Sequence, residues 1–432
     1  MRRIFLLRGL QMEPAGSILS SVQTIPTQPP ATAAEFHPGR AQLMELVPPD
    51  LVPLLANRRW SEAWALTVPR IADDAGDARA WHAHGLAELG LRHFAGGGAA
   101  LDRAVWLGAE EPGPMPGTAY TKLAAAYALA AEGQGETAIR RLAFQRANQV
   151  PASAGLLAAM VVRAPSPARL SRTAEELLSM ALTLGHDDIA AHCAAGWLAI
   201  SPDNATARFM LSATAGAAAP VAAPADYLRE HFDGFAPGFE ATLVDRLGYN
   251  TPRVMRDALL PWLRQQQGAL RILDAGCGTG LSGPVFRPFA AHLTGVDIAP
   301  GMLELAAAKG CYDALDAAEL TAFLRAAAKG PPFDLIVATD VVMYFGEVAT
   351  LLDVAGAVLR PGGRFGFTVE AHDQPGYRLY PTGRYKHARG FVEQRIARAG
   401  LLSRVVEPTV IRQEGGEPVT GWLFLAERPA AP

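Results

Sequence analysis

Hydrophobic residues follow two different patterns along the 432-residue chain, and the change between them lies near residue 220. From about residue 55 to 215, apolar residues recur at three- and four-residue spacing, which is typical of amphipathic helices. Ser166 and Pro167 provide an N-cap and a first-turn proline for one helix, and Asp203 or Asn204 can cap the last. We predict helices at residues 78–90, 97–107, 117–131, 135–149, 167–184, 187–199 and 203–214.

The second half of the chain alternates short β-type runs with helical segments. The runs read RILDA, HLTGVDI, DLIVATD, RFGFTVE, LSRVVEPTVI and PVTGWLFLAE. Strands that alternate with helices predict an α/β fold with a parallel sheet. The last two runs are separated only by a short turn at residues 414–417, so we expect an antiparallel hairpin at the edge of the sheet.

Proline and small residues divide the chain into segments. Residues 1–54 are expected to form an irregular tail, because residues 13–53 contain eight prolines and little periodicity. A helical domain follows at residues 55–214. Residues 215–225 are small and broken by prolines, which predicts a linker. The α/β domain then spans residues 226–432.

Charge and cysteine content exclude several classes of protein. The 39 basic and 42 acidic residues leave a net charge of −3, so no overall field attracts a polyanion, and nucleic acid is disfavoured as a partner. The three cysteines are far apart and form no CxxC pair, so neither a disulfide framework nor a metal site is expected. The N-terminal apolar run is interrupted at Arg8 and no apolar stretch is long enough for a membrane span, which predicts a cytoplasmic protein.

A glycine-rich turn follows the first apolar run of the second half. It comprises Ala275–Gly280 and precedes a helix, as expected where a ligand must approach the backbone closely. Asp297 ends the next apolar run, where a carboxylate can accept hydrogen bonds from ribose hydroxyls. Gly278, Gly280 and Gly283 also fit a dinucleotide-binding pattern. Against that alternative, the carboxylate of Asp274 would repel a pyrophosphate, whereas it suits the ammonium group of a methionine moiety.

Four motifs in order carry a family resemblance. LDAGCGTG, GVDIAPGML, DLIVATDVVMYF and LRPGGRFGFTVE resemble the motif set of class I S-adenosylmethionine-dependent methyltransferases, over residues 226–432. The resemblance implies a Rossmann-like, doubly wound, seven-stranded sheet with an antiparallel last strand, behind an all-α helical repeat domain. It also implies S-adenosyl-L-methionine as the cofactor and S-adenosyl-L-homocysteine as its product.

The helical region resembles tetratricopeptide-type repeats, as in bacterial methyltransferases that carry such repeats. Trp81 and Gly85 stand four apart, and Leu101 and Ala104 fall near the packing positions of the following helix. The next unit begins near Tyr120, 39 residues after Trp81, whereas such repeats have a period of about 34. The alternative is an irregular helical domain whose aromatic residues fill its core. Either form would offer a face to a protein partner.

The resemblance assigns roles to cofactor-binding residues. Asp274 and the glycines would hold the methionine and ribose end, Asp297 both ribose hydroxyls, and Glu319 or Asp316 the adenine amine. Asp340 would lie beside the sulfonium. The full set implied for the cofactor is Asp274, Gly276, Cys277, Gly278, Gly280, Asp297, Ile298, Met302, Glu319, Leu320, Asp340 and Val341. Cys277 is interpreted as a small space-filling residue rather than a reactive thiol.

The segment after the run RFGFTVE combines aromatic and basic residues, which predicts an acceptor pocket; a solvated loop is the alternative. His387 or His372 is our candidate general base, because imidazole titrates in the useful range. Asp340 and Glu370 are the acidic alternatives, and Tyr385 completes the catalytic candidates. The substrate pocket is predicted to contain Tyr249, Tyr344, Glu370, Tyr377 and Arg384. Aromatic residues at 227–249 are expected to cover the cofactor or, alternatively, to pack on the sheet edge.

These patterns together predict a methyltransferase that acts on oxygen or nitrogen of a small-molecule or carrier-bound acceptor. Two alternatives remain: a protein methyltransferase that recruits a polypeptide through the helices, and a non-catalytic scaffold that binds the cofactor. The sequence Asp340-Val-Val-Met replaces the Asp/Asn-Pro-Pro-Tyr type motif of enzymes that methylate exocyclic amines, so nucleic-acid bases are disfavoured.

Overall fold

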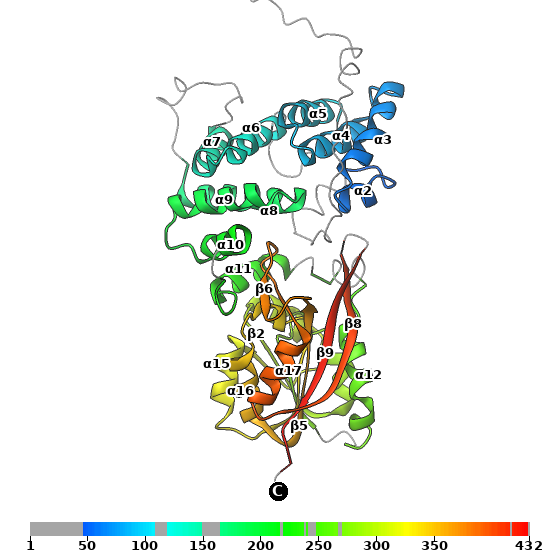
Figure 1. The fold of residues 1–432 in the computed structure, drawn as a ribbon, viewed down its shortest axis with the longest axis vertical. Coiled ribbons are helices and arrows are strands. Elements are labelled where there is room, and N and C mark those ends of the chain that lie inside the picture. The colour runs from blue at the N-terminus through cyan, green and yellow to red at the C-terminus, as the bar shows by residue number, and fades with distance from the viewer. Residues whose placement is uncertain are drawn as a thin grey trace, which may run out of the picture.

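The computed structural model describes residues 46–108, 119–148, 165–216, 219–236, 239–240, 248–266, 270–414 and 417–430. Figure 1 shows a helical region stacked above an α/β region. Val47 and Leu51 lie inside the predicted tail, yet both are buried in the helical core. Packing therefore begins before residue 55, and residues 1–45 of that tail lie outside the described residues.

The helical region contains each predicted helix within a few residues. Two helices were not predicted, α2 and α3, and α3 contains an internal proline, Pro69. The helices are α2 (Val52–Ala56), α3 (Trp60–Asp73), α4 (Ala78–Gly90), α5 (Phe94–Trp106), α6 (Ala119–Ala131), α7 (Gly135–Asn148), α8 (Pro167–Leu184), α9 (Asp187–Ile200) and α10 (Ala205–Ala215).

Local signals set the helix ends, and small residues set the helix spacing. The Ser166 side chain accepts a hydrogen bond from the Arg169 amide at 3.3 Å, which caps α8 as predicted. Asn204, not Asp203, caps α10 through the Ala207 amide at 2.7 Å. A Cβ on Gly85 would lie 2.5 Å from Leu101 Cγ, so α4 and α5 approach more closely than a larger residue would permit. The repeat character of this region remains a prediction.

The second region contains a nine-stranded sheet among the described residues, where seven strands were predicted. Its order is β3-β2-β1-β4-β5-β7-β6, and β9 pairs with both β5 and β8. β9 runs antiparallel to β5, and the hairpin across residues 414–417 forms as predicted. The strands are β1 (Leu270–Ala275), β2 (Ala290–Asp297), β3 (Ala314–Ala317), β4 (Phe333–Ala338), β5 (Leu359–Ala371), β6 (Tyr377–Leu379), β7 (Tyr385–His387), β8 (Leu402–Glu414) and β9 (Glu417–Glu427).

Strands β6 and β7, which like β3 were not among the predicted β-type runs, form a short hairpin at the end of β5. β4 pairs with β5 only as far as Phe367, whereas β7 pairs with β5 at Glu370 and Ala371. On its other edge Glu370 pairs with Gly421 of β9. Because a strand residue has one neighbour on each side, the hairpin continues the β4 side of β5, directly beyond the carboxyl end of β4.

Helices cover both faces of the sheet, as in a doubly wound fold. One face packs on Leu324, Leu352 and Ile396, and the other on Leu259 and Phe286. The elements around the sheet are α11 (Ala225–Phe235), α12 (Thr251–Leu263), α13 (Gly283–Phe286), η5 (Arg287–Phe289), α14 (Pro300–Ala308), α15 (Leu320–Ala327), η6 (Val342–Tyr344), α16 (Ala349–Val358) and α17 (Arg389–Arg398).

The predicted linker is hydrogen-bonded to the loop that follows β4. The Ala223 amide donates to the Tyr344 carbonyl at 2.8 Å, and the Gly346 amide donates to the Val221 carbonyl at 2.8 Å. The Tyr385 hydroxyl donates to the Pro220 carbonyl at 2.6 Å. The backbone of residues 220–223 is thus hydrogen-bonded to the loop after β4 and to Tyr385 of β7, although the side chains of this segment are too small to form a core.

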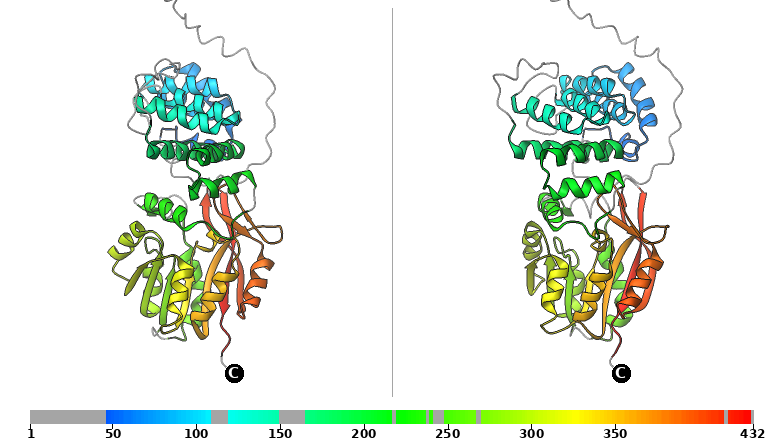
Figure 2. Two further views of the ribbon diagram at one scale, coloured as in Figure 1. Left: turned by 90° about the vertical axis from the view of Figure 1, so that its left-hand side faces the viewer. Right: turned by 60° about the vertical axis from the view of Figure 1, so that its left-hand side comes forward.

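The hydrophobic core of the helical region continues into the α/β region. The rings of Phe209 in α10 and Tyr227 in α11 have centroids 4.9 Å apart, and Phe209 lies 6.4 Å from the ring of Tyr385 in β7. Figure 2 shows the green helices α10 and α11 at the junction above the sheet. The β6–β7 hairpin is therefore held between the sheet and the helices. None of the described helices is long and apolar enough to cross a membrane.

Candidate functional site

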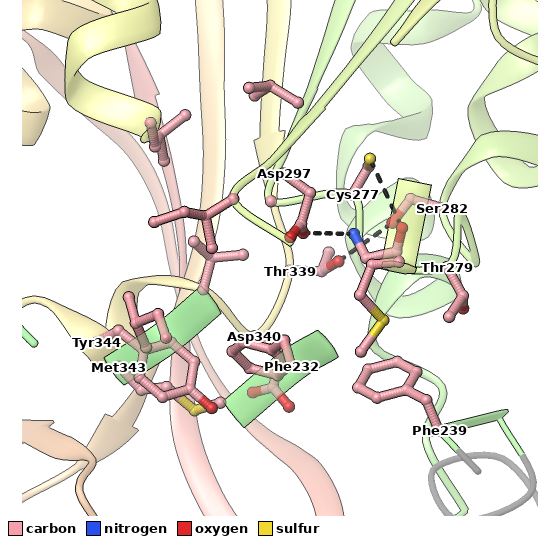
Figure 3. Close-up of a pocket in the computed structure, with 18 of the residues that line it drawn as sticks. Phe232, Phe239, Cys277, Thr279, Ser282, Asp297, Thr339, Asp340, Met343 and Tyr344 are labelled. Carbon is pink, nitrogen blue, oxygen red and sulfur yellow. Dashed lines mark hydrogen bonds between the residues drawn. The ribbon is translucent and has the colours of Figure 1, made fainter. Parts of the chain in front are cut away.

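A cavity of about 1290 Å³, its open mouth included, lies at the carboxyl ends of β1, β2 and β4. Figure 3 shows Asp297 and the glycine loop on one side of this space and Phe232, Phe239 and Tyr344 across it. The lining residues come from α11, the glycine loop, the ends of β2 and β4, and η6. Arg384 of the β6–β7 hairpin and Arg412 of β8 also line the cavity. This position is where ligands bind in open α/β sheets.

The glycine loop has a backbone that residues with side chains rarely adopt. Gly276, Gly278 and Gly280 have φ values of 71°, 52° and 86°. A Cβ on Gly276 would lie 2.5 Å from a methyl carbon of Val341, which also lines the cavity. Glycine is thus required both for the left-handed backbone and for the approach of the β4 loop. Gly276 and Gly278 line the cavity, whereas Gly280 does not.

Asp297 lies at the end of β2 and joins the glycine loop to the α14 turn. Its carboxylate accepts hydrogen bonds from the amides of Gly278 at 2.8 Å and Ala299 at 2.9 Å (Figure 3 draws the first). Burial raises the pKa of Asp297, and the backbone amides partly oppose that shift. Each carboxylate oxygen keeps a second lone pair, so the side chain can accept further hydrogen bonds from a ligand.

Asp274 is buried beneath the loop and does not itself line the cavity. Its Oδ2 accepts a hydrogen bond from the Tyr312 hydroxyl at 2.6 Å, whereas its Oδ1 has no hydrogen-bond partner among the described residues. Burial raises the pKa of Asp274 from 3.8 to about 7; the Tyr312 hydroxyl lowers it and the Asp297 carboxylate raises it. A buried carboxylate oxygen without a donor fits a site that receives a cationic group.

Asp274 predicts a specific pH dependence of stability. Because its folded-state pKa exceeds the unfolded value, its contribution is fully present below about pH 4 and is lost as the pH rises to about 7. The Asp274→Asn variant, measured without ligand, does not have this loss. The difference in free energy of unfolding between the variant and the unmodified chain should therefore shift in favour of the variant, by up to about 4 kcal/mol, as the pH rises from about 4 to about 7. Urea unfolding at several pH values measures it, and parallel curves for the two proteins would contradict the prediction.

The predicted adenine end is only partly as expected. Ile298, Met302 and Leu320 line the cavity. Glu319 also lines it, but its carboxylate caps α15 by accepting from the amides of Thr321 at 2.9 Å and Ala322 at 2.7 Å. The amides of the α15 N-terminus thus use part of the hydrogen-bonding capacity of the carboxylate that was predicted to meet an adenine amine. Asp316, the alternative, is exposed and does not line the cavity.

The opposite end of the cavity is built around Asp340, which follows β4. Asp340 has a φ of 62°, a strained conformation for a residue with a side chain. Arg412 Nη1 donates to its two carboxylate oxygens at 3.0 and 3.1 Å, and Arg412 Nη2 donates to Glu370. Tyr249, Tyr344 and Arg384 line the same end, as predicted. Burial raises the pKa of the Tyr344 hydroxyl.

Several predicted catalytic residues do not face the cavity. His387 is buried, and its Nε2 lies 2.8 and 3.1 Å from the carbonyl oxygens of Phe345 and Gly346, while burial lowers its pKa to about 4. His387 therefore does not fit the predicted role of general base, which corrects the sequence prediction. Tyr385 donates to the linker, and Tyr377 packs against it at 5.8 Å. His372 packs on Tyr380 outside the cavity lining.

Glu370 lies behind the cavity rather than in its lining and is fully buried. Cys277 does line the cavity, but burial raises the pKa of its thiol, so it is not a reactive thiolate. Sequence reasoning missed Arg412 and Tyr312, the partners of the two key carboxylates. It also missed His231 of α11, which lines the cavity beside Phe232. Among these three residues, only His231 had a signal in the sequence, namely the aromatic composition of residues 227–239.

Comparison with known proteins identifies the segment that forms this site. Residues 273–365 match the family model described as "Methyltransferase domain". This segment is therefore similar to methyltransferase domains. It contains the end of β1, the glycine loop, Asp297 and Asp340, whereas α11 and Arg412 lie outside the match. Among the described residues, no group of three or more His, Cys, Asp or Glu side chains is placed to hold a metal ion.

Curated relatives match the same part of the chain. Ubiquinone biosynthesis O-methyltransferase of Xylella fastidiosa (strain 9a5c) is 31% identical over 96 residues, which cover 22% of this chain and 39% of that protein. Methyltransferase-like protein 27 of Homo sapiens is 40% identical over 85 residues, which cover 19% of this chain and 34% of that protein. The chain thus spans about two fifths or less of the length of these two relatives.

Solved structures are less similar. Magnesium protoporphyrin IX methyltransferase from Synechocystis PCC 6803, determined with bound SAM, has 17% sequence identity and a TM-score of 0.32. The alignment covers 41% of this chain and 79% of that chain. A likeness at this level does not bear on function. The function is therefore inferred from the site and from the sequence matches.

Proposed function

We propose that this protein is an S-adenosylmethionine-dependent methyltransferase that acts on an oxygen or nitrogen atom of a small-molecule or carrier-bound acceptor. One observation carries the proposal. The glycine loop and the Asp297 carboxylate face one cavity, and both belong to the segment that matches the methyltransferase domain model. The same cavity extends past Asp340 to an aromatic end that has room for an acceptor.

The residues present fit the cofactor. Asp297 can accept hydrogen bonds from ribose hydroxyls, and Ile298, Met302 and Leu320 provide an apolar surface for adenine. The free Oδ1 of Asp274 provides negative charge beneath the loop for an ammonium group. When bound, S-adenosylmethionine supplies an electrophilic methyl carbon on a sulfonium sulfur and leaves as S-adenosylhomocysteine.

At the acceptor end, the chain has to position an acceptor atom and, for a hydroxyl, remove a proton. Phe232 and Tyr344, whose ring centroids are 5.5 Å apart and perpendicular, restrict water at this end. Asp340 is the carboxylate that lines it, and Arg412 fixes its orientation. Asp340 is thus our candidate to receive the proton in place of His387. The relatives named O-methyltransferases favour oxygen as the accepting atom.

Calorimetric titration of the purified protein tests the proposal. We expect binding of S-adenosylhomocysteine and S-adenosylmethionine with dissociation constants in the micromolar range, and no binding of NAD. Above its pKa of about 7, the Asp274 carboxylate below the loop disfavours the pyrophosphate of NAD. Binding of NAD alone would overturn the proposal and make Gly278, Gly280 and Gly283 a dinucleotide-binding loop.

A further inference from the structure

The acceptor end of the cavity contains an ionic cluster that extends beyond the proposed proton acceptor Asp340 and its partner Arg412. Arg412 donates to Asp340 at 3.0 Å and also to Glu370. Arg384 Nη1 lies 3.8 Å from Glu370 Oε1, and Lys386 Nζ lies 3.8 Å from Glu370 Oε2. Among the described residues, the cluster therefore brings three cations to two carboxylates, from β4, β5, the β6–β7 hairpin and β8.

The cluster is largely shielded from water. The side chains of Arg412 and Glu370 are 2% and 0% exposed, and those of Arg384 and Lys386 are 16% and 24% exposed. Interactions between charges are stronger at such sites than at the surface. Two of the cations, Arg384 and Arg412, line the cavity, whereas Glu370 and Lys386 lie behind them. A ligand in the cavity thus meets guanidinium groups at this end.

Arg384 and Arg412 both line the cavity, and both have contacts within the protein. Arg412 is bound between the carboxylates of Asp340 and Glu370. Arg384 Nη1 lies 3.8 Å from Glu370 Oε1, and the guanidinium also contacts the Tyr344 hydroxyl. A guanidinium has five N–H donors in a planar fork, which suits a planar anionic group in addition to these contacts.

Aromatic side chains lie beside this guanidinium. Tyr344 and Phe232 make an edge-to-face pair, and Phe239 lies 6.4 Å from Phe232 on the cofactor side. Figure 3 shows Tyr344, Met343 and Phe232 around the same space as Asp340. These surfaces suit the flat face of a ring. The chemistry at this end is therefore an apolar, ring-shaped space that ends in a cation.

We propose that the methyl acceptor is an aromatic carboxylate, whose ring packs on Tyr344 and Phe232 and whose carboxylate binds Arg384. This inference rests on the proposed function, since it names the acceptor class of the same site. Asp340 is paired with Arg412, so its charge is compensated where the acceptor carboxylate binds. A charged hydrogen bond at a shielded site contributes about 1.5–3 kcal/mol, which corresponds to about ten- to a hundredfold in affinity.

Matched probes test the inference on the full chain saturated with S-adenosylhomocysteine. The probes are 4-hydroxybenzoate, its neutral analogue 4-hydroxybenzamide, and phenyl phosphate, each titrated by calorimetry. We expect 4-hydroxybenzoate to bind at least about tenfold more tightly than the amide. The Arg384→Gln variant should lose this preference. The Arg378→Gln variant is the matched control and should keep it, because Arg378 lies on the same hairpin but is exposed and outside the cavity lining.

The outcomes separate the two proposals. Failure to bind S-adenosylhomocysteine would count against the proposed function itself. If the protein binds S-adenosylhomocysteine, then equal affinity for acid and amide, or no binding of any probe, overturns the aromatic carboxylate. A preference for phenyl phosphate over 4-hydroxybenzoate also overturns it and points to a phosphorylated acceptor. Persistence of the acid preference in Arg384→Gln overturns the role of Arg384. Unchanged S-adenosylhomocysteine binding by that variant shows that it is folded.

Discussion

The Asp297→Ala variant should bind S-adenosylhomocysteine at least about 100-fold more weakly than the unmodified chain. In the proposed complex the carboxylate accepts hydrogen bonds from two ribose hydroxyls, and hydrogen bonds to a charged group contribute about 1.5–3 kcal/mol each. Asp297 also holds the amides of Gly278 and Ala299, so its removal loosens the loop that faces the ligand. Calorimetric titration measures the change in dissociation constant.

Asp316→Ala is the matched control for this prediction. Asp316 lies on the adjacent strand β3, is exposed, and does not line the cavity, so its removal should leave the affinity unchanged. Asp297→Asn keeps one carbonyl acceptor, so its affinity for S-adenosylhomocysteine should lie between those of Asp297→Ala and the unmodified chain. Unchanged affinity in Asp297→Ala would show that the ribose assignment is wrong, even if the protein still binds the cofactor.

The second large effect concerns stability. Arg412→Met should lower the free energy of unfolding by about 3–5 kcal/mol, because it leaves the buried Glu370 and the nearly buried Asp340 without their shared cation. The methionine side chain fills a similar space, so the loss reflects charge rather than a void. Urea unfolding followed by circular dichroism measures it.

Arg404→Met provides the control on the same strand. Arg404 pairs with Glu427 at 2.7 Å, but its side chain is 47% exposed, and such pairs contribute at most about 1 kcal/mol. Adding Glu370→Gln to Arg412→Met should restore part of the loss, because it removes one uncompensated charge. If Arg412→Met and Arg404→Met cost the same, the buried cluster does not have the importance assigned to it.

The cofactor end of the site was predictable because its residues are close in sequence. A strand, a glycine turn and the carboxylate at the end of the next strand are set by one β-turn-α-β unit, and parallel strands bring their carboxyl ends to one edge. Gly276, Gly278 and Asp297 line the cavity, whereas Gly280 does not. Glu319 also lines the cavity, but its carboxylate caps α15, so its contact with an adenine amine remains a prediction.

The acceptor end was not predictable to the same extent, because it depends on the register of a short hairpin. Successive residues of a strand point to opposite faces. Arg384 and Lys386 both reach Glu370, whereas Tyr385 and His387 both face the packing side, toward α10, the linker and the β4 loop. Both sets lie in one segment, and nothing in the sequence indicates which set faces the cavity side and which faces the packing side. Composition therefore indicated a pocket but selected His387 over Arg384 as its active group.

Arg412 shows a second limit. It lies 72 positions from Asp340 and 42 from Glu370 along the chain, and it reaches both from β8, which is separated from β5 by β9. A single arginine in a long hairpin strand carries no local signal of such a role. Hydrophobic periodicity predicted the hairpin itself, since that pattern is local.

The pairing of residues 220–223 with the loop after β4 determines where this chain can be divided. A cut after residue 222 would remove the carbonyl that binds the Tyr385 hydroxyl and the one that binds the Gly346 and Glu347 amides. The segment Val342–Gly346, which forms one wall of the cavity, would then lose its backbone neighbour. A catalytic fragment expressed without the helices should therefore begin before Pro220, so that any change in turnover reports on the helices rather than on a damaged wall.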